Sequence, residues 1–182
     1  TSLCVWVPFN EGWGQFDAAR IAGEVRRLDS TRPIDHASGY FDQGAGDFDS
    51  YHVYFKHFRP KTDRRNLDPT RQRVMALTEF GGYSLASPDH MSAEHEFGYK
   101  VFRTQADLDS ALESLYDSDV LAHLAQGLAA VVYTQVSDVE DEINGLFTYD
   151  RQVLKPDPAL LRAVNQRLYD EFERLHAGEV TS

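Results

Sequence analysis

Two glutamates stand directly after apolar runs of the sequence, at points where a strand would give way to a loop. Glu11 ends the stretch "VPFNE", and Glu79 ends the stretch "VMALTE". The run Leu3–Phe9 before Glu11 is rich in Val, Trp and Leu, which is typical of a buried strand. In α/β folds the carboxyl ends of parallel strands share one edge of the sheet, and active sites form there. The sequence therefore predicts that these two carboxylates meet at one edge.

Two carboxyl groups that face one sugar ring can together cleave a glycosidic bond. One group protonates the leaving oxygen, and the other acts as nucleophile or base. The alternative is that each glutamate is a solvated loop residue or a charge near the start of a helix. Both glutamates lie beside aromatic residues and glycines, which favours the glycosidic interpretation.

The elements that must position these residues alternate along the chain. Strands are predicted at Leu3–Phe9, Ile34–Ser38, Tyr51–Phe55, Val74–Thr78 and Leu128–Val136. Helices are predicted at Phe16–Asp29, from Leu108 to about Gln126, and from Asp157-Pro158 onward. The last strand is apolar on both faces, as expected in a parallel sheet. This order predicts an α/β fold of βα units, which suits an open flavodoxin-like sheet or part of a (β/α)8 barrel.

The bulk composition limits the classes of partner that the chain is expected to bind. The 182 residues suit one domain, residues 1–182, and a formal net charge of −11 argues against binding a nucleic acid. No apolar stretch approaches the ~20 residues that crossing a membrane needs. Cys4 is the single cysteine, which excludes an internal disulfide, predicts a buried thiol and favours the cytoplasm without fixing the location. Because the chain opens inside a predicted strand, we expect it to be a piece of a longer protein.

Five stretches resemble glycoside hydrolase family 2, the family of β-galactosidases, β-glucuronidases and β-mannosidases. They are "VWVPFNEGWGQFD", "DHASGYFDQGAGDF", "SYHVY", "ALTEFGGYS" and "YTQVSDVEDEINGLFTYDRQVLKPD". The resemblance covers nearly the whole chain and implies the C-terminal half, strands 4 to 8, of a TIM (β/α)8 barrel. It also implies a retaining mechanism, in which the two carboxyl groups lie ~5–5.5 Å apart.

This resemblance implies a role for each matching residue. Glu11 matches the acid/base, which must be protonated, and apolar neighbours such as Trp13 would favour that form. Glu79 matches the nucleophile, which must stay ionised and needs hydrogen-bond donors nearby. Tyr54 matches a tyrosine that hydrogen-bonds the nucleophile, and Asn10 matches the residue that holds the sugar 2-hydroxyl. Without the resemblance, Tyr54 would be a half-buried strand aromatic and Asn10 a turn residue or helix cap.

Further residues are candidates for contact with a carbohydrate substrate. His36 and His52 lie at predicted strand ends, where they contact substrate or serve as structural histidines. Trp13 and Tyr133 could stack on sugar faces, although the family usually has Trp where Tyr133 stands. We expect no metal and no cofactor, because the Asp and His residues between positions 35 and 57 fit no compact ligand motif. The acidic run 138–142 is expected to be a solvated loop.

Two functional hypotheses follow. The first is a retaining glycoside hydrolase of carbohydrate metabolism, and the alternative is a non-catalytic α/β module that binds carbohydrate or a partner protein. The pair of glutamates favours the enzyme, because a binding module needs neither an acid nor a nucleophile. We expect this chain alone to be inactive, and to form homo-oligomers through sheet edges at Leu3–Phe9 and Leu128–Val136.

Overall fold

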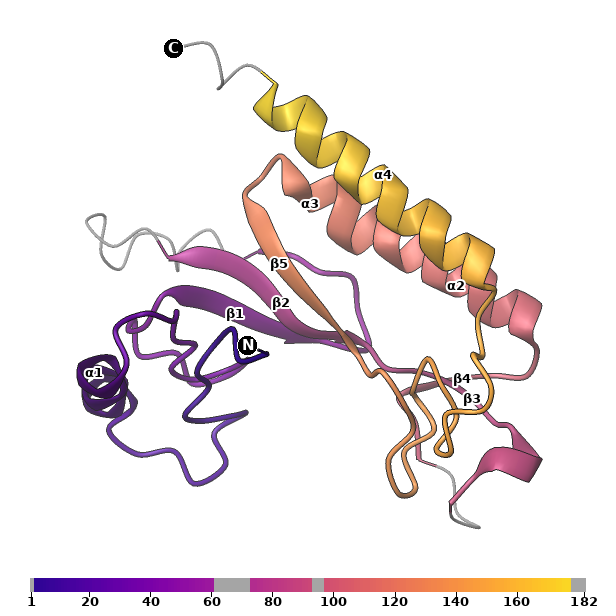
Figure 1. Cartoon of the computed structure of the whole chain (residues 1–182), viewed down its shortest axis with the longest axis horizontal. Helices are drawn as coiled ribbons and strands as arrows, with labels where there is room; N and C mark the ends of the chain where they lie inside the picture. Colours follow the sequence, from indigo (N-terminus) through magenta and orange to yellow (C-terminus); the bar gives the residue numbers. More distant parts are fainter. Residues whose placement is uncertain (1, 61–72, 93–96, 178–182) are drawn as a thin grey trace. The chain divides into compact units, whose positions relative to one another are not determined.

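A computed structural model of the chain describes residues 2–60, 73–92 and 97–177 (Figure 1). These residues form a mixed α/β fold with parallel strands in open sheets, which confirms the predicted α/β class. The chain divides into two units, which we describe one at a time. The first unit consists of Thr1–His52, Arg59–Glu79 and Gly127–Val131, and the second of Val53–Phe58, Phe80–Gln126 and Val132–Ser182.

A three-stranded sheet has the strand order β1-β2-β5. Its strands are β1 (Phe48–Val53), β2 (Val74–Gly81) and β5 (Leu128–Thr134). β2 has a neighbour on each side, and its Ala76 and Leu77 are fully buried. β5 ends the order, and its Val132 is 55% exposed, so the expectation of a strand buried on both faces is wrong. The exposed Val132 shows that one face of β5 is not covered there within the described residues. β5 also pairs along one edge only in the described part of the chain, and self-association at the other edge stays a prediction.

The two segments before this sheet pair more sparsely than predicted. Parallel bridges join Trp6 to Ile34 and Asn10 to Ser38, but no continuous strand forms at Leu3–Phe9 or at Ile34–Ser38. The first segment is largely exposed, with Val7 at 49%, and Cys4 is exposed as well. The buried strand and the buried thiol were therefore wrong predictions, because within the described residues this segment has a partner on one side only. The parallel direction of the pairing is as predicted.

Helix α1 (Ala18–Leu28) follows in the first unit, close to its predicted bounds. It buries Ala18 and Ala22 and ends at Asp29, whose backbone N–H donates to Val25 O. The Asp29 carboxylate accepts a hydrogen bond from Trp6 Nε1 at 2.9 Å. Hydrogen bonds from Thr31 and Trp6 hold the pKa of Asp29 well below its usual range. The end of α1 therefore fixes the segment that leads to Glu11.

The second unit contains most of the helices. Strands β3 (Tyr83–Leu85) and β4 (Lys100–Phe102) form a parallel pair. The helical segments are the 3-10 turn η2 (Pro88–His90), α2 (Gln105–Leu115), the π-helical η3 (Tyr116–Leu121), α3 (Ala122–Leu124) and α4 (Pro158–His176). As predicted, α4 begins at Asp157-Pro158, where the Asp157 carboxylate accepts from Ala159 N at 2.7 Å. α2 and α4 lie side by side (Figure 1).

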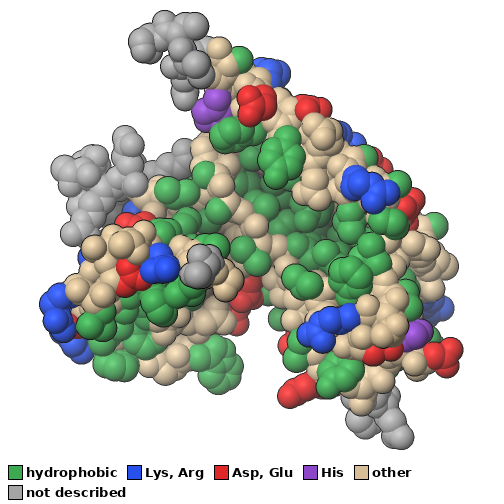
Figure 2. All heavy atoms as spheres, viewed as in Figure 1, with side chains coloured by type: hydrophobic (Ala, Val, Ile, Leu, Met, Phe, Trp, Pro, Cys, Tyr) green, Lys and Arg blue, Asp and Glu red, His purple; other side chains and the backbone are tan. Residues whose placement is uncertain are grey.

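Hydrophobic side chains reach the surface at many points (Figure 2). Trp13 is 80% exposed and Phe55 is 79% exposed, which are high fractions for aromatic residues. In the described part of the chain, the helices are too short or too polar to cross a membrane. Trp13 follows Glu11 by two positions, so the predicted site includes the exposed aromatic side chain of Trp13.

Candidate functional site

Three side chains of the first unit converge on one point. His52 Nδ1 lies 2.7 Å from Glu11 Oε1 and 3.4 Å from Glu79 Oε2. The three atoms that these residues offer all lie within 4.8 Å of one another. The two glutamates are separated by more than sixty positions in the sequence and are brought together by a histidine from β1. We call Glu11, His52 and Glu79 the carboxylate–histidine group.

The turn that carries Glu11 has an unusual backbone. Glu11 has φ 53° and Gly12 has φ 81°, so the chain makes two consecutive left-handed steps, which L-residues other than glycine seldom adopt. Backbone hydrogen bonds hold this turn, from Glu11 N to Ser38 O at 2.9 Å and from Trp13 N to Asn10 O at 3.0 Å. A left-handed non-glycine residue at a polar site is a common sign of functional constraint. The turn positions the Glu11 carboxylate beside β1.

Close packing holds the ring of His52. Its side chain has no exposed surface, whereas the side chains of Glu11 and Glu79 are 27% and 28% exposed. A Cβ at Gly39 would lie 2.4 Å from His52 Cγ, so only glycine leaves room for the ring. Gly39 also has φ 83°, which glycine adopts without strain. The histidine is thus fixed and buried, while both carboxylates remain accessible to solvent.

Glu79 differs slightly from its predicted position. It lies within β2, two residues before the strand ends, instead of in the loop after the strand. β1 likewise ends at Val53, short of the predicted Phe55. The strand position gives the Glu79 carboxylate a backbone that is held on both sides by hydrogen-bonded neighbours. A residue on a strand is positioned more rigidly than one on a loop.

Negative charge accumulates around His52. One ring nitrogen faces two carboxylates, and a histidine nitrogen can donate only one hydrogen there. Tyr40 lies near the same charge. Burial raises the pKa of its hydroxyl, and the charges of Glu11 and Glu79 raise it further. Its ring meets the His52 ring edge-on, with centroids 5.8 Å apart. One ring nitrogen of His52 therefore lies between two carboxylates, and Glu11 is its hydrogen-bond partner at 2.7 Å.

The same three atoms form a donor set that a divalent cation could use. However, the 2.7 Å separation of His52 Nδ1 and Glu11 Oε1 has the length of a charge-assisted hydrogen bond. Two ligands of one tetrahedral zinc ion would lie about 3.3 Å apart, given metal–ligand bonds of about 2.0 Å. The geometry fits a shared proton better than it fits a metal centre.

Three further residues predicted for the site belong to the same unit. Asn10 is exposed and its backbone pairs with Ser38, directly before the turn that carries Glu11. Trp13 is exposed two residues after Glu11. His36 is only 1% exposed, and its Nε2 lies 3.2 Å from Asp42 Oδ1, so its visible contact is with the following loop. The roles of all three in substrate binding stay predictions.

Tyr54 and Tyr133 belong to the second unit. The Tyr54 ring stacks on Tyr99 with centroids 4.0 Å apart, and its hydroxyl lies 3.5 Å from Thr134 Oγ1. The Tyr133 hydroxyl accepts from Tyr83 N at 3.3 Å, and burial raises its pKa. A Cβ at Gly81 would lie 2.3 Å from the Tyr133 ring, which shows how closely that backbone covers one side of the ring. The predicted contacts of these tyrosines with the nucleophile and with sugar stay predictions.

One polar residue differs from the sequence-based expectation. Asp138, in the acidic run expected to be solvated, is 4% exposed and pairs with Lys155 Nζ at 2.7 Å. Gly145 N also donates to the Asp138 carboxylate at 2.8 Å. The prediction was wrong for this residue because the carboxylate finds two donors within its own loop region. A sequence pattern of alternating acidic residues gives no sign of such a pairing.

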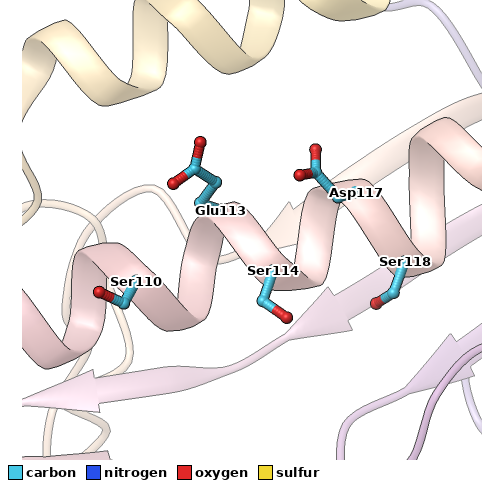
Figure 3. A pocket seen from close by; sticks show the side chains of 5 residues that line it. All are labelled: Ser110, Glu113, Ser114, Asp117 and Ser118. Carbon is cyan, nitrogen blue, oxygen red and sulfur yellow. The ribbon is translucent and has the colours of Figure 1, made fainter.

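A shallow hollow lies along α2 and η3 (Figure 3). Ser110, Ser114 and Ser118 line it together with Glu113 and Asp117, and the two acidic side chains point toward α4. Both acidic groups are bound by Arg167, at 3.0 Å and 2.9 Å. Because Arg167 of α4 already pairs with both acidic groups, this hollow is a weaker candidate than the carboxylate–histidine group.

Sequence reasoning missed the residues behind His52. Ser38 Oγ lies 3.0 Å from His52 Nε2 and 3.0 Å from Thr78 Oγ1. The signal available was the polar spacing of "DHAS" in an otherwise buried segment, since strand neighbours two positions apart share a face.

Comparison with protein-family models gives no match to this chain, and comparison with curated proteins gives none either. The case for a function therefore rests on the residues and their geometry.

Proposed function

We propose that this chain carries the catalytic carboxylates of a retaining glycoside hydrolase that cleaves β-glycosidic bonds. The observation that carries the proposal is the meeting of Glu11 and Glu79 at one histidine, with the three facing atoms within 4.8 Å. Retaining enzymes need carboxyl groups about 5–5.5 Å apart, whereas inverting enzymes need about 6.5–9.5 Å to admit a water molecule. The short separation favours the retaining geometry.

The two glutamates would take different roles. Glu11 lies at the position that the resemblance gives to the acid/base, and His52 Nδ1, 2.7 Å away, can exchange a proton with it as it gives one to the leaving oxygen and later takes one back. Glu79 lies farther from that nitrogen, at 3.4 Å, and on a strand, so it suits the fixed carboxylate that attacks the anomeric carbon. In the second step Glu11 would accept a proton from the water that hydrolyses the glycosyl–Glu79 ester. Trp13, which is exposed nearby in sequence, offers an apolar face to a sugar.

We also propose a fold that is more specific than the α/β class. We infer that the strands belong to the C-terminal half of a (β/α)8 barrel, in keeping with the resemblance to glycoside hydrolase family 2. Two features support the inference: a glutamate directly after the parallel bridge of Asn10 with Ser38, and a second near the end of β2. Barrel enzymes collect catalytic residues at such strand ends.

The test is the stereochemistry of hydrolysis by the natural full-length protein. Aryl β-galactoside, β-glucuronide, β-mannoside and β-glucoside would be screened, and the first sugar released from an active substrate would be followed by proton NMR. The proposal predicts that the β-anomer appears first and then mutarotates. An initial α-anomer would overturn the retaining assignment. Binding of the glycosides without turnover would favour the carbohydrate-binding module instead, and this chain by itself is expected to be inactive.

A further inference from the structure

An exposed aromatic side chain, Phe41, lies against the turn that carries Glu11. A Cβ at Gly12 would lie 2.5 Å from Phe41 Cδ2, so one side of the phenyl ring rests on the backbone of Gly12. Gly12 directly follows Glu11, and consecutive Cα atoms are about 3.8 Å apart. The Phe41 ring therefore contacts the residue next to the proposed acid/base.

Most of the Phe41 ring faces solvent. Phe41 is 70% exposed, although phenylalanine is among the residues most often buried. An aromatic ring that served only to pack on Gly12 would gain more stability by burying the rest of its apolar surface. The exposed part of the ring is therefore accessible to a ligand that binds at this turn.

The backbone of Phe41 is held in a conformation that phenylalanine seldom adopts. Its φ is 55°, in the left-handed region, which is unfavourable for a residue with a Cβ. Gln15 Nε2 donates a hydrogen bond to Phe41 O at 2.9 Å, which ties this backbone to the segment that follows the Glu11 turn. Strained backbone persists where the surrounding structure holds it, and it is concentrated at functional sites.

The residue after Phe41 anchors the loop to the start of β1. Arg73 binds the Asp42 carboxylate through both of its terminal nitrogens, at 2.8 Å and 2.6 Å, and also donates to Phe48 O at 3.1 Å. The side chains of Arg73 and Asp42 are only 8% and 11% exposed. A bidentate ion pair fixes geometry as well as charge. Phe41 is therefore presented on a well-supported part of the loop.

The contact with the residue after Glu11 indicates which part of a substrate Phe41 would meet. The acid/base gives its proton to the oxygen of the leaving group, whereas the nucleophile attacks the anomeric carbon of the sugar. The leaving group must therefore lie beside the residue that carries the acid. The neighbouring Tyr40 packs edge-on against His52, with centroids 5.8 Å apart, so two consecutive residues of this loop contact residues of the site.

We propose that the leaving group of the substrate stacks on Phe41, and that the substrates are β-glycosides whose leaving group has a flat apolar face. An aromatic ring and the apolar face of a second sugar share this chemistry. The inference rests on the proposed function for the role of Glu11. It adds the class of leaving group, which the two carboxylates by themselves do not select.

The experiment compares two activated glycosides of one sugar, a dinitrophenyl β-glycoside and a β-glycosyl fluoride, in the natural full-length protein. Neither leaving group needs much protonation, but only the dinitrophenyl group has a ring that can stack. Phe41→Ala should lower kcat/KM for the dinitrophenyl glycoside about 3- to 10-fold, the effect of one aromatic contact. The same variant should leave kcat/KM for the fluoride unchanged, because fluoride has no surface for the ring to contact.

Other patterns of loss would overturn the inference. Equal losses for both substrates would mean that the substitution displaces Glu79 or the sugar. A loss confined to a phenyl glycoside, which depends on protonation, would mean that it displaces Glu11. Phe41→Gly also removes the ring and relieves the left-handed backbone, so it covers the case in which the Ala variant fails to fold. Phe41→Trp keeps a flat ring and should retain the wild-type ratio of the two kcat/KM values.

Phe16→Ala is the matched control. Phe16 is a 58% exposed aromatic residue of the same unit, and its ring meets Phe9 edge-on with centroids 5.5 Å apart. Its loss should leave the ratio of kcat/KM for the dinitrophenyl glycoside to kcat/KM for the fluoride unchanged. A fall in this ratio as large as that in Phe41→Ala would contradict a specific role of Phe41.

A comparison of leaving groups then separates the two sources of a flat apolar face. If Phe41→Ala lowers kcat/KM for a disaccharide more than for a phenyl glycoside of the same sugar, the leaving group that stacks is a second sugar; the reverse order assigns an aromatic group. A methyl glycoside should show no loss. Equal losses for every substrate would remove this inference and leave the proposed function intact, whereas a wild-type protein that hydrolyses no glycoside would remove both.

Discussion

Two groups of charged side chains, one in each unit, differ in how their charges are matched and in how far solvent reaches them. In the second unit, Lys155 and Asp138 form a pair at 2.7 Å with side chains 1% and 2% exposed. Lys155 Nζ also donates to Ile143 O at 2.9 Å, and Gly145 N donates to Asp138 at 2.8 Å. Charges match one to one, and solvent has no access. Such a pair specifies the local structure and has no spare capacity for chemistry.

The carboxylate–histidine group of the first unit is unbalanced. One ring nitrogen of His52 faces two carboxylates, and both of these are more than a quarter exposed. A group with more acceptors than protons, open to solvent on one side, can change its proton distribution when a substrate arrives. From this contrast we expect mismatched charge with solvent access, and not burial of charge alone, to mark a reactive site.

The largest effect should come from Glu79→Ala in the full-length protein. Loss of the proposed nucleophile should lower turnover of an activated aryl glycoside by at least about 10⁴-fold, because no covalent intermediate can form. Added azide should restore part of the turnover and yield a glycosyl azide of inverted configuration. Product analysis by NMR checks the configuration. Turnover that survives the substitution would show that Glu79 is not the nucleophile, and the contrast between the two units would then not separate a reactive group from a structural one.

The structural pair should respond in stability and not in activity. Lys155→Met leaves Asp138 buried without its cation, which should lower the free energy of unfolding by about 3–5 kcal/mol in urea titrations. The double variant Lys155→Met/Asp138→Leu should recover much of that loss, because an apolar pair carries no desolvation cost. Failure of the double variant to recover would indicate that the pair does more than balance charge.

Glu11→Ala should give a smaller loss that depends on the leaving group. Turnover of a glycoside with a poor leaving group should fall about 100-fold further than that of a dinitrophenyl glycoside, since a good leaving group needs little protonation. The measurement is kcat/KM across a series of aryl glycosides of graded acidity. Equal losses across the series would contradict the acid/base role of Glu11.

The smallest effect concerns an exposed pair used as a reference. His90 Nδ1 lies 2.7 Å from Asp150 Oδ2, and hydrogen bonds from His90 and Thr148 lower the pKa of Asp150 to about 2. Because the folded-state pKa lies below the unfolded value of 3.8, this stabilisation is present above about pH 4 and is lost as the pH falls toward 2. His90→Ala should raise the Asp150 midpoint in a carbon-13 NMR titration; an unchanged midpoint would assign the lowered pKa to Thr148 and the backbone.

The sequence predicted much of the framework because local physics decides it. The cap and proline at Asp157-Pro158 start α4 where expected, and α1 lies close to its predicted range. The meeting of Glu11 and Glu79 also followed from the sequence, because parallel segments with glutamates at corresponding ends bring them to one edge. These features depend on periodicity, capping and chain direction, all of which short stretches of sequence carry.

Burial and long-range pairing could not be predicted in the same way. Leu3–Phe9 looks like a core strand, yet Val7 is half exposed, because exposure depends on neighbours that the segment itself does not specify. His52 was expected either to contact substrate or to be a structural histidine, and nothing in the sequence indicated that its ring would lie between Glu11 and Ser38. The spacing of "DHAS" hints that its polar residues share a face, but which of them faces the His52 ring depends on the pairing of separate segments.

The most direct test of the central claim is to identify the residue that forms the covalent intermediate. The full-length protein would be incubated with 2-deoxy-2-fluoro-β-glycosides of the active sugar, digested, and analysed by mass spectrometry. A fluoroglycosyl ester is expected on the peptide that contains Glu79, and none in the Glu79→Gln variant. An adduct on any other carboxylate, Glu11 included, would contradict the assignment of Glu79 and Glu11 as nucleophile and acid/base.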